Sequence, residues 1–449
     1  MNFIPNSSIK DIMLKETGIN NVEELFLDIP KKIAVKKLDI GTGLSQQDTE
    51  QKLRDIANKN KSFHDMTSFL GGGVKPHYIP SVVKSILSRA EFYTAYTPYQ
   101  PEASQGFLQA MFEYQSMIAE LTGMDISNCS LYDGFTAISE AALMCTRINR
   151  KKTFLIPQNI SWEKKSILKN YAKGPGIKIK EIPYDIKTGK IDLDELKKHV
   201  DKTTSGVYIE NPNFFGIFED KIDEINNIVK EAGSLFVVGI DPISLGITKS
   251  PGKYGADIVI GEGKAFGNHM DFGGSSLGIF ACNKENLRQM PGRIIGITRD
   301  TDGKRAFCMA LQTREQHIRR GRATSNICTN EGLCALAAVS YLSWIGGNGL
   351  KELSVTNFEK GQKLADRIES IDGFEKMFDS VHFNEFVIKC DKNANIINKK
   401  LLNKDIQGGL ILDQRYSEFK NCILFGISEI HSDNDIEKLI SSLKEVSYV

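Results

Sequence analysis

Short apolar runs alternate with amphipathic stretches through the middle of the chain. Between the runs lie helical patterns, such as those over 162–171 and 222–232. The runs themselves have the length and β-branched content of buried strands, and they cover 153–157, 177–182, 206–210, 234–240, 257–261 and 275–280. This alternation predicts an α/β fold with a mainly parallel sheet and helices on both of its faces. Such sheets bind ligands at the carboxyl ends of their strands.

Helical periodicity also frames this central region. Between 105 and 123 the apolar residues recur at spacings of four and three, so one face of a helix is buried. Beyond a glycine cluster that begins at Gly346, the pattern predicts a long helix (about 350–370), strands near 385–390 and 421–427, and a closing helix over 433–445. We therefore expect three parts: an N-terminal helical arm (1–65), a large α/β domain (66–345) and a smaller C-terminal α+β domain (346–449).

The charge balance excludes some classes of binding protein. The 449 residues carry 57 Lys and Arg against 56 Asp and Glu, so the formal net charge is 57 − 56 = +1. Retention on nucleic acid or on anionic lipid by bulk charge needs a basic surface, so no nucleic-acid or membrane partner is expected. No apolar run was found that approaches the roughly 18 residues of a membrane span, and the N-terminus lacks the apolar core of a secretory signal. The sequence therefore predicts a cytoplasmic protein.

The eight cysteines never fall at Cys-x-x-Cys spacing, and most lie in apolar contexts. Buried reduced thiols are the favoured interpretation over a metal or redox centre, so no metal is expected.

One acid and one lysine stand where cofactor chemistry is conceivable. Asp241 directly follows the strand-like run 234–240, and Lys264 comes 264 − 241 = 23 residues later, before several glycines. A strand-end acid followed by a lysine is typical of pyridoxal phosphate enzymes of the aspartate aminotransferase type. There the acid keeps the pyridine nitrogen protonated and the lysine forms the Schiff base. The alternatives are an Asp241 that opens a turn and a Lys264 on the surface.

A helix start provides a second candidate cofactor contact. Asp133, Gly134 and Thr136 precede an apolar helical stretch, and a turn of this kind can offer backbone amides and a hydroxyl to a phosphate. Plain helix capping by Asp133 explains the same residues equally well.

The segment 91–105, with the sequence EFYTAYTPYQPEASQ, combines tyrosines, threonines, amides and acids around two prolines that restrict the backbone. Preorganised polar groups of this kind suit recognition of a small polar substrate in a cleft. The candidate pocket residues are Thr94, Tyr96, Tyr99, Gln100, Glu102 and Gln105. A stiff interface loop is the other interpretation.

Between Arg293 and Arg322, eight basic residues stand against three acidic ones. This local excess could dock an acidic partner or a carboxylate, and a solvated basic face is the alternative.

Several of these segments together resemble subunit 1 (alpha) of the two-subunit glycine dehydrogenase (decarboxylating), the P-protein family of the glycine cleavage system. The matching stretches are spread over about the first three quarters of the chain. They are IPNSSIKDIMLKETGINNVEELFLDIP, SFLGGGVKPHYIP, EFYTAYTPYQPEASQGFLQAMFEYQSMIAELTGM, NCSLYDGFTAISEAALM, GIDPISLG with GADIVIGEG, and RRGRATSNICTNEGLCALAA.

The resemblance implies the fold of type I pyridoxal phosphate enzymes. It also implies an oxidoreductase of glycine catabolism, which decarboxylates glycine on pyridoxal phosphate and transfers the aminomethyl group to the lipoyl arm of the H-protein. Its partners would be subunit 2, the H-protein and glycine, with two copies of each subunit in a heterotetramer. In this family the Schiff-base lysine belongs to subunit 2, and subunit 1 helps to wall the active site.

The chain departs from that pattern at one place. The resemblance implies a glutamine at the position of Lys264, and a lysine stands there instead. The resemblance implies a partner subunit that is inert alone and whose Asp241 is a relic of cofactor binding. Two alternatives stay open beside it. The chain could be a self-sufficient pyridoxal phosphate enzyme that uses Lys264, or a purely structural scaffold without pocket residues.

Overall fold

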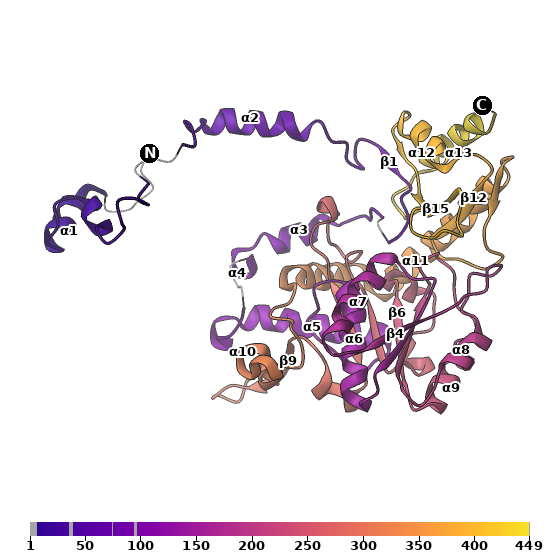
Figure 1. Cartoon of the computed structure of the whole chain (residues 1–449), viewed down its shortest axis with the longest axis horizontal. Helices are drawn as coiled ribbons and strands as arrows, with labels where there is room; N and C mark the ends of the chain where they lie inside the picture. Colours follow the sequence, from indigo (N-terminus) through magenta and orange to yellow (C-terminus); the bar gives the residue numbers. More distant parts are fainter. Residues whose placement is uncertain (1–6, 36–38, 74, 94–96, 449) are drawn as a thin grey trace. The chain divides into compact units, whose positions relative to one another are not determined.

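The structure is a computed structural model, and it describes residues 7–35, 39–73, 75–93 and 97–448 (Figure 1). The chain divides into two compact units, Met1–Lys61 and Ser62–Val449. Each is described by itself below.

The first unit contains short helices only, as far as its described residues go. They are η1 (Ser7–Ile9), α1 (Lys10–Glu16), η2 (Val22–Phe26) and α2 (Gln46–Ala57). None of the described residues of α1, η2 and α2 is buried.

The second unit is built on a sheet of seven strands in the order β2-β8-β7-β6-β5-β3-β4. The strands are β2 (Ile126–Ser127), β3 (Thr153–Pro157), β4 (Lys178–Ile182), β5 (Thr204–Asn211), β6 (Leu235–Ile240), β7 (Ile258–Glu262) and β8 (Gly278–Cys282). Strands β3 to β7 run parallel, and β8 and β2 are antiparallel to their neighbours. The predicted mainly parallel sheet is confirmed, and each predicted run corresponds to one strand.

Helices cover both faces of this sheet (Figure 1). On one face, α6 (Gly134–Asn149) and α7 (Trp162–Lys173) pack with Phe154 and Ile156 of β3. On the other face, α8 (Leu193–His199) and α9 (Ile222–Glu231) pack with Leu155. Successive β3 side chains thus enter opposite cores, as the pleat of a strand requires.

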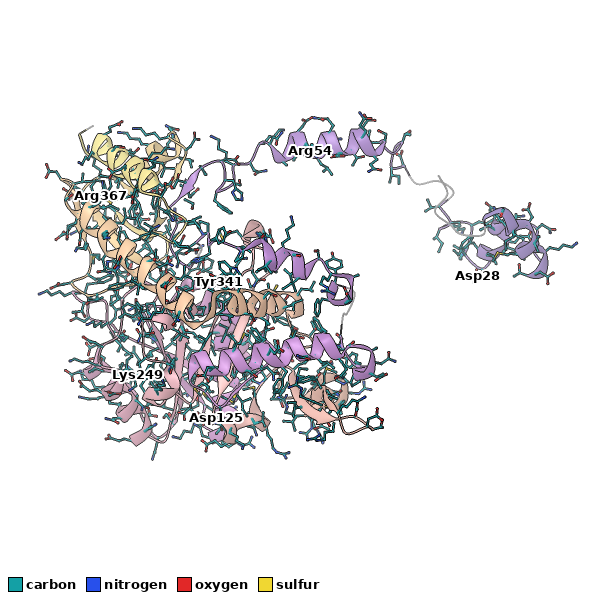
Figure 2. The ribbon with its side chains drawn as sticks, turned by 180° about the vertical axis from the view of Figure 1, so that it is seen from behind. Asp28, Arg54, Asp125, Lys249, Tyr341 and Arg367 are labelled. Carbon is teal, nitrogen blue, oxygen red and sulfur yellow. The ribbon has the colours of Figure 1, made fainter. Side chains whose placement is uncertain are left out.

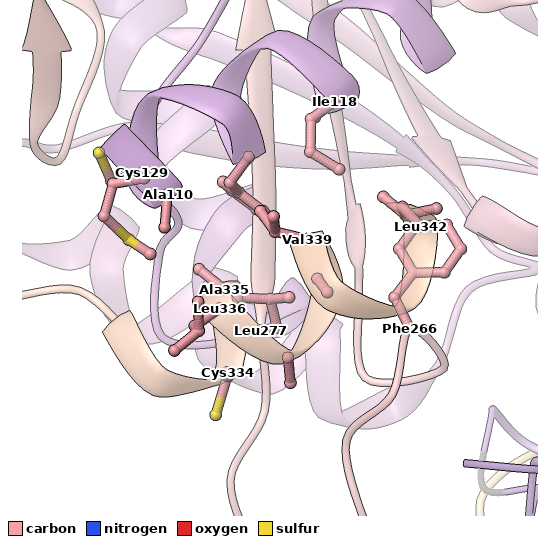
Figure 3. Close-up of a cluster of buried hydrophobic side chains, with 14 of the residues drawn as sticks. Ala110, Ile118, Cys129, Phe266, Leu277, Cys334, Ala335, Leu336, Val339 and Leu342 are labelled. Atoms are coloured by element: carbon pink, nitrogen blue, oxygen red, sulfur yellow. The ribbon is translucent and has the colours of Figure 1, made fainter. Parts of the chain in front are cut away.

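Two long helices form a further layer. Helix α5 (Gln105–Thr122) lies beside the first part of α11 (Gly332–Glu369), as Figure 2 shows from behind. Figure 3 shows Ala110 and Ile118 of α5 in the same buried cluster as Val339 and Leu342 of α11. The periodicity over 105–123 is therefore confirmed as a helix with one buried face.

The long helix corrects one sequence-based statement. An 18-residue stretch of α11 is apolar enough, by length and composition, to cross a membrane, and 56% of that stretch is buried inside the protein. This stretch contains many alanines, glycines and serines among its larger apolar residues, so it does not form an unbroken run of large apolar side chains. Burial against α5 is the behaviour of a core helix. The predicted helix at 350–370 is the second part of α11, which also begins earlier than expected.

An antiparallel sheet with the order β11-β12-β15-β14 follows α11. It comprises β11 (Phe374–Lys376), β12 (Glu385–Cys390), β15 (Cys422–Gly426) and β14 (Leu410–Ile411), with α12 (Ala394–Leu402) and α13 (Asp433–Tyr448) packed on it. The predicted strands near 385–390 and 421–427 and the closing helix are confirmed. A short parallel pair joins β1 (Thr67–Ser68) to β13 (Ile406–Gln407).

Several further elements belong to the second unit besides short 3-10 helices. They include α3 (Ser81–Leu87), α4 (Ala90–Tyr93), η3 (Pro101–Ala103), α10 (Gln316–Arg319) and the hairpin of β9 (Ile294–Arg299) and β10 (Arg305–Ala310). The hairpin was not predicted from the sequence, although most residues of its two strands are apolar.

Six of the eight cysteines are buried, as predicted, Cys308 is half-buried and Cys328 is exposed. Among the residues that the structure describes, no group of three or more His, Cys, Asp or Glu side chains could hold a metal ion.

Candidate functional site

Three acids mark the carboxyl edge of the main sheet, where such folds bind ligands. Glu210 lies near the end of β5, Asp241 directly follows β6, and Glu262 ends β7. Ile240 pairs with Gly261, so Asp241 comes next to Glu262 across the two parallel strands. The partners of these acids decide what this edge can bind.

Glu262 is satisfied entirely by the protein backbone. The N–H groups of Gly134, Lys264 and Leu277 donate to its carboxylate at 3.0, 2.9 and 2.8 Å. Gly134 is the first residue of α6, so this carboxylate occupies the donor end of the helix. Burial raises the pKa of Glu262 above its ordinary value, against the lowering effect of the three N–H donors.

More carboxylates surround the same helix start. Asp133 is the N-cap of α6, and its Oδ1 accepts the N–H of Thr136 at 2.6 Å. The Thr136 hydroxyl donates to the Asp133 carbonyl oxygen at 3.1 Å. Burial first, and then the charges of Asp133 and Glu262, raise the pKa of Glu331. A phosphate would meet negative charge here rather than free amides.

Asp241 also has partners inside the chain. Its Oδ1 accepts the N–H of Ile243 at 3.0 Å, and its Oδ2 lies 3.9 Å from Nζ of Lys75. The Lys75 side chain is only 4% exposed, and its ammonium lies 3.2 Å from Oε1 of Glu385. The negative charge of Asp241 therefore already faces a buried cation.

Glu210 is the third of the three acids at this edge of the sheet. Its carboxylate pairs with the ammonium of Lys164 and accepts the hydroxyl hydrogen of Tyr208 at 2.7 Å.

Lys264 follows Glu262 on the turn after β7. Its backbone N–H donates to Glu262, and its ammonium donates to the carbonyl oxygen of Ser275 at 3.0 Å. The side chain is half-buried. The structure thus brings Asp133, Gly134, Thr136, Asp241 and Lys264 to one region of the sheet edge, where each hydrogen bonds within the chain.

These contacts do not fit pyridoxal phosphate bound by this chain alone. A phosphate needs free donors at the helix start, and Glu262 and Asp133 already accept the N–H groups of Gly134 and Thr136 and add negative charge there. A protonated ring nitrogen needs a carboxylate, and Asp241 already faces the ammonium of Lys75, which it shares with Glu385. The sequence indicated Asp241 correctly as a strand-end acid. It missed Glu262, although a glutamate at the end of the next buried strand was a visible signal.

The polar segment after α4 is the other candidate. Tyr99 is 50% exposed, Gln100 and Glu102 are exposed, and Pro101 opens the short helix η3. Thr94 and Tyr96 lie outside the described residues. The exposed members can therefore reach a ligand or a partner from this surface.

Gln105 has a different environment from the rest of that segment. Its Nε2 donates to the carbonyl oxygens of Pro101 and Phe307, both at 2.8 Å, and its Oε1 accepts the N–H of Phe307 at 2.9 Å. Its amide therefore fastens the segment to β10 and is already bonded within the chain.

The basic region predicted over 293–322 splits into two groups. Arg293 and Arg314 are buried, whereas the acids Asp300 and Asp302 are exposed. The other six basic residues are also exposed, namely Arg299, Lys304, Arg305, Arg319, Arg320 and Arg322. Arg314 donates to the carbonyl oxygens of Met290, Gly292 and Leu311. It is therefore part of the fold, and the exposed excess of positive charge over Asp300 and Asp302 is 6 − 2 = 4.

Comparisons with known proteins place this geometry in context. The family model of the glycine cleavage system P-protein matches residues 1–443. A relative from Thermococcus onnurineus, named "probable glycine dehydrogenase (decarboxylating) subunit 1", is 48% identical over 447 residues, which are 99% of each chain. A protein of the same name from Desulfitobacterium hafniense is 44% identical over 448 residues, which are 99% of this chain and 100% of that one.

Solved structures agree with the sequence matches. The crystal structure of glycine decarboxylase (P-protein) of the glycine cleavage system, in inhibitor-bound form, is similar with a TM-score of 0.92 and 37% identity, over 99% of this chain and 100% of that one. A glutamate decarboxylase of Lactobacillus brevis has a TM-score of 0.69 at 11% identity, over 96% of this chain and 97% of that one. The second likeness shows the fold alone, which is that of type I pyridoxal phosphate enzymes.

Proposed function

Because the chain belongs to the glycine cleavage system P-protein family, we propose that it acts as subunit 1 of a glycine dehydrogenase (decarboxylating) that works only together with a homologous subunit 2. The enzyme decarboxylates glycine and passes the aminomethyl group to the lipoyl arm of the H-protein. Matches along almost the full length of both chains support the assignment of the whole protein.

Within that complex, the pyridoxal phosphate belongs to subunit 2. The carboxylate of Glu262 at the start of α6 carries this part of the proposal, because it takes the donors that a phosphate would need. The ammonium of Lys264 donates to a carbonyl oxygen, which gives no support to the alternative of a Schiff base in this chain.

The contribution of this chain is a wall of the partner's active site. Tyr99, Gln100 and Glu102 present a phenol, an amide and a carboxylate from a surface that the protein itself leaves open. They can orient a small zwitterion such as glycine and limit the access of water to it. Thr94 and Tyr96 belong to the same proposed wall, and Gln105 supports it from behind.

We also propose the wider organisation that the sequence suggested. The helical N-terminal unit, the α/β region and the antiparallel C-terminal sheet after Gly346 support a division near residues 65 and 345. The relatives' name, subunit 1, supports a partner chain, and the family suggests a heterotetramer in the cytoplasm.

The direct experiment is glycine-dependent exchange of the glycine carboxylate with labelled bicarbonate in the presence of H-protein. We expect no exchange with this chain alone, exchange after subunit 2 is added, and a loss of about ten-fold in Tyr99→Phe. The matched control is Tyr93→Phe, an exposed tyrosine outside the proposed wall. Exchange by this chain alone would favour the self-sufficient enzyme. Unchanged kinetics in Tyr99→Phe, Gln100→Ala and Glu102→Gln would favour the structural scaffold.

A further inference from the structure

We propose that Arg293 is the positioning residue of the proposed active-site wall, and that it acts through Thr97 and Tyr99 without touching substrate. This inference rests on the proposed function, since it concerns the same segment. The sequence placed Arg293 only among eight basic residues of a local excess.

Arg293 is buried, with 4% of the residue exposed, and it immediately precedes β9. One terminal nitrogen of its guanidinium lies 3.4 Å from the hydroxyl of Thr97, and the other lies 3.4 Å from the hydroxyl of Tyr99. The guanidinium carbon also lies 5.7 Å from the centre of the Tyr99 ring. Both ends of the Thr97–Tyr99 turn thus face one rigid cation.

The same guanidinium binds a second segment of the chain. It donates to the hydroxyl of Thr329 at 2.9 Å and to the carbonyl oxygen of Cys328 at 2.8 Å. It therefore connects the Thr97–Tyr99 turn to the residues just before α11, which packs in the core. A planar guanidinium offers five donors in a fixed fork and can hold two segments in a defined geometry, whereas an ammonium offers three donors on a flexible stem.

An acid and a histidine support this arrangement. Oε2 of Glu315 lies 3.8 Å from Nε of Arg293 and 3.5 Å from Nδ1 of His317. The His317 ring meets the Tyr99 ring edge-on at 5.7 Å. Tyr99 is thus held by the guanidinium and by the imidazole, and the buried charge of Arg293 has a counter-ion.

The other end of the wall is fixed by Gln105 against β10. Between the two fixed points lie Gln100 and Glu102, both exposed. Groups that orient a substrate must be held to within about 0.5 Å. Arg293 therefore holds the Thr97–Tyr99 turn in place, and Gln105 holds the other end of the segment against β10.

The test compares Arg293→Lys with Arg305→Lys. Arg305 is a matched control, because it lies on the same hairpin with its guanidinium 5.7 Å from the Phe307 ring and is exposed. The first measurement is amide hydrogen exchange in the full chain, followed in the peptide that contains Tyr99, Ala103 and Ser104. Exchange there is expected to rise about ten-fold in Arg293→Lys and to stay unchanged in Arg305→Lys, with α5 protected in both. Equal exchange in the two variants would overturn the proposal.

The second measurement is the kinetics of the two-subunit complex. For Arg293→Lys, kcat/KM for glycine is expected to fall about ten-fold, mainly through KM, because an ordered wall contributes to substrate binding. Kinetics equal to those of Arg305→Lys would overturn the proposal. If the wild-type complex shows no glycine exchange, the proposed function fails, and amide exchange still decides the role of Arg293.

A second variant covers the case in which Arg293→Lys loosens the whole protein. Thr329→Val removes one acceptor of Arg293 with little change of shape and leaves the buried ion pair intact. We expect the peptide around Tyr99 to exchange about three-fold faster in this variant, while α5 stays protected. Unchanged exchange would count against the connection between the two segments.

Discussion

At the scale of single residues, the backbone amides that converge on Glu262 decide what the sheet edge can bind. A carboxylate that accepts three N–H groups is held tightly, and it brings a negative charge to the place where a phosphate would lie. The ammonium of Lys75 faces the carboxylates of both Asp241 and Glu385, at 3.9 and 3.2 Å. The chain thus places hydrogen bonds and an ion pair of its own at this sheet edge.

Glu262→Gln tests this arrangement. The glutamine oxygen can still accept from two N–H groups, but its NH₂ group would face the third donor. We expect the free energy of unfolding to fall by about 1–3 kcal/mol. The measurement is urea unfolding against the exposed control Glu352→Gln on α11. Equal midpoints for the two variants would show that the Glu262 contacts contribute little.

Glu219 makes a pH-dependent contribution to stability. Burial raises its pKa from 4.5 to about 7, although the N–H of Ile191 donates to it. Between these values the folded chain keeps a proton that the unfolded chain has lost, so stability falls as the pH rises through this window. The cost above pH 7 is roughly 2–4 kcal/mol.

Glu219→Gln removes this cost, because glutamine stays neutral and keeps an oxygen for Ile191. We expect urea midpoints equal to wild type near pH 4.5 and clearly higher than wild type at pH 8. A midpoint difference that is the same at both pH values would contradict the buried, protonated state of Glu219.

The place of Asp241 and Lys264 in the fold could be predicted from the sequence, whereas the contacts of Asp241 with distant residues could not. Asp241 and Lys264 follow strands that the apolar pattern marks, so their place at the sheet edge was predictable. Lys75 and Glu385 reach the same place from distant segments, and no local pattern reports contacts of that range. Of the two interpretations of Asp133, phosphate contact or helix cap, its bond to Thr136 shows the helix cap.

At the scale of elements, α11 joins two parts of the fold. Its first part packs on α5, and its second part packs on the antiparallel sheet through Leu364 and Ile368. Between them Gly346 has φ 63° and ψ 178°, a conformation that is almost restricted to glycine. This interruption lets one helix serve two cores.

Gly346→Ala tests the interruption, with Gly347→Ala as the neighbouring control. No atom lies within 4 Å of an added Cβ at either position, so only the backbone conformation differs. We expect Gly346→Ala to lose about 1–3 kcal/mol. Gly347→Ala is expected to gain about 0.5–1 kcal/mol, because Gly347 is helical. Thermal unfolding measures both, and shifts of the same sign would contradict this account.

The apolar pattern predicted the elements unevenly. Strands β3, β5, β6 and β7 contain apolar runs that are buried on both faces, so their positions were visible, whereas the edge strand β4 alternates polar and apolar residues. The strands of the β9–β10 hairpin are mostly apolar, with polar and exposed residues at the turn end, and this hairpin was not predicted although Arg293 stands at its start. The segment that needs the most precise support is therefore held by an element that periodicity does not reveal.

At the scale of the whole molecule, we propose that two related chains divide the work of catalysis. This chain fills its own sheet edge with Glu262 and Lys75, and it offers an open polar surface at Tyr99, Gln100 and Glu102. The family resemblance could be predicted from the sequence, and matches over 99% of the chain confirm it. The proposed wall of the partner's site could not be derived from the sequence alone, because it involves contacts between two chains.

The most direct measurement of this division is borohydride reduction with pyridoxal phosphate, followed by peptide mass mapping of this chain alone and of the two-subunit complex. The account predicts no selective adduct on the isolated chain and a near-stoichiometric adduct on a lysine of subunit 2 in the complex. A near-stoichiometric, site-selective adduct at Lys264 would contradict it and would make this chain a cofactor-binding enzyme in its own right.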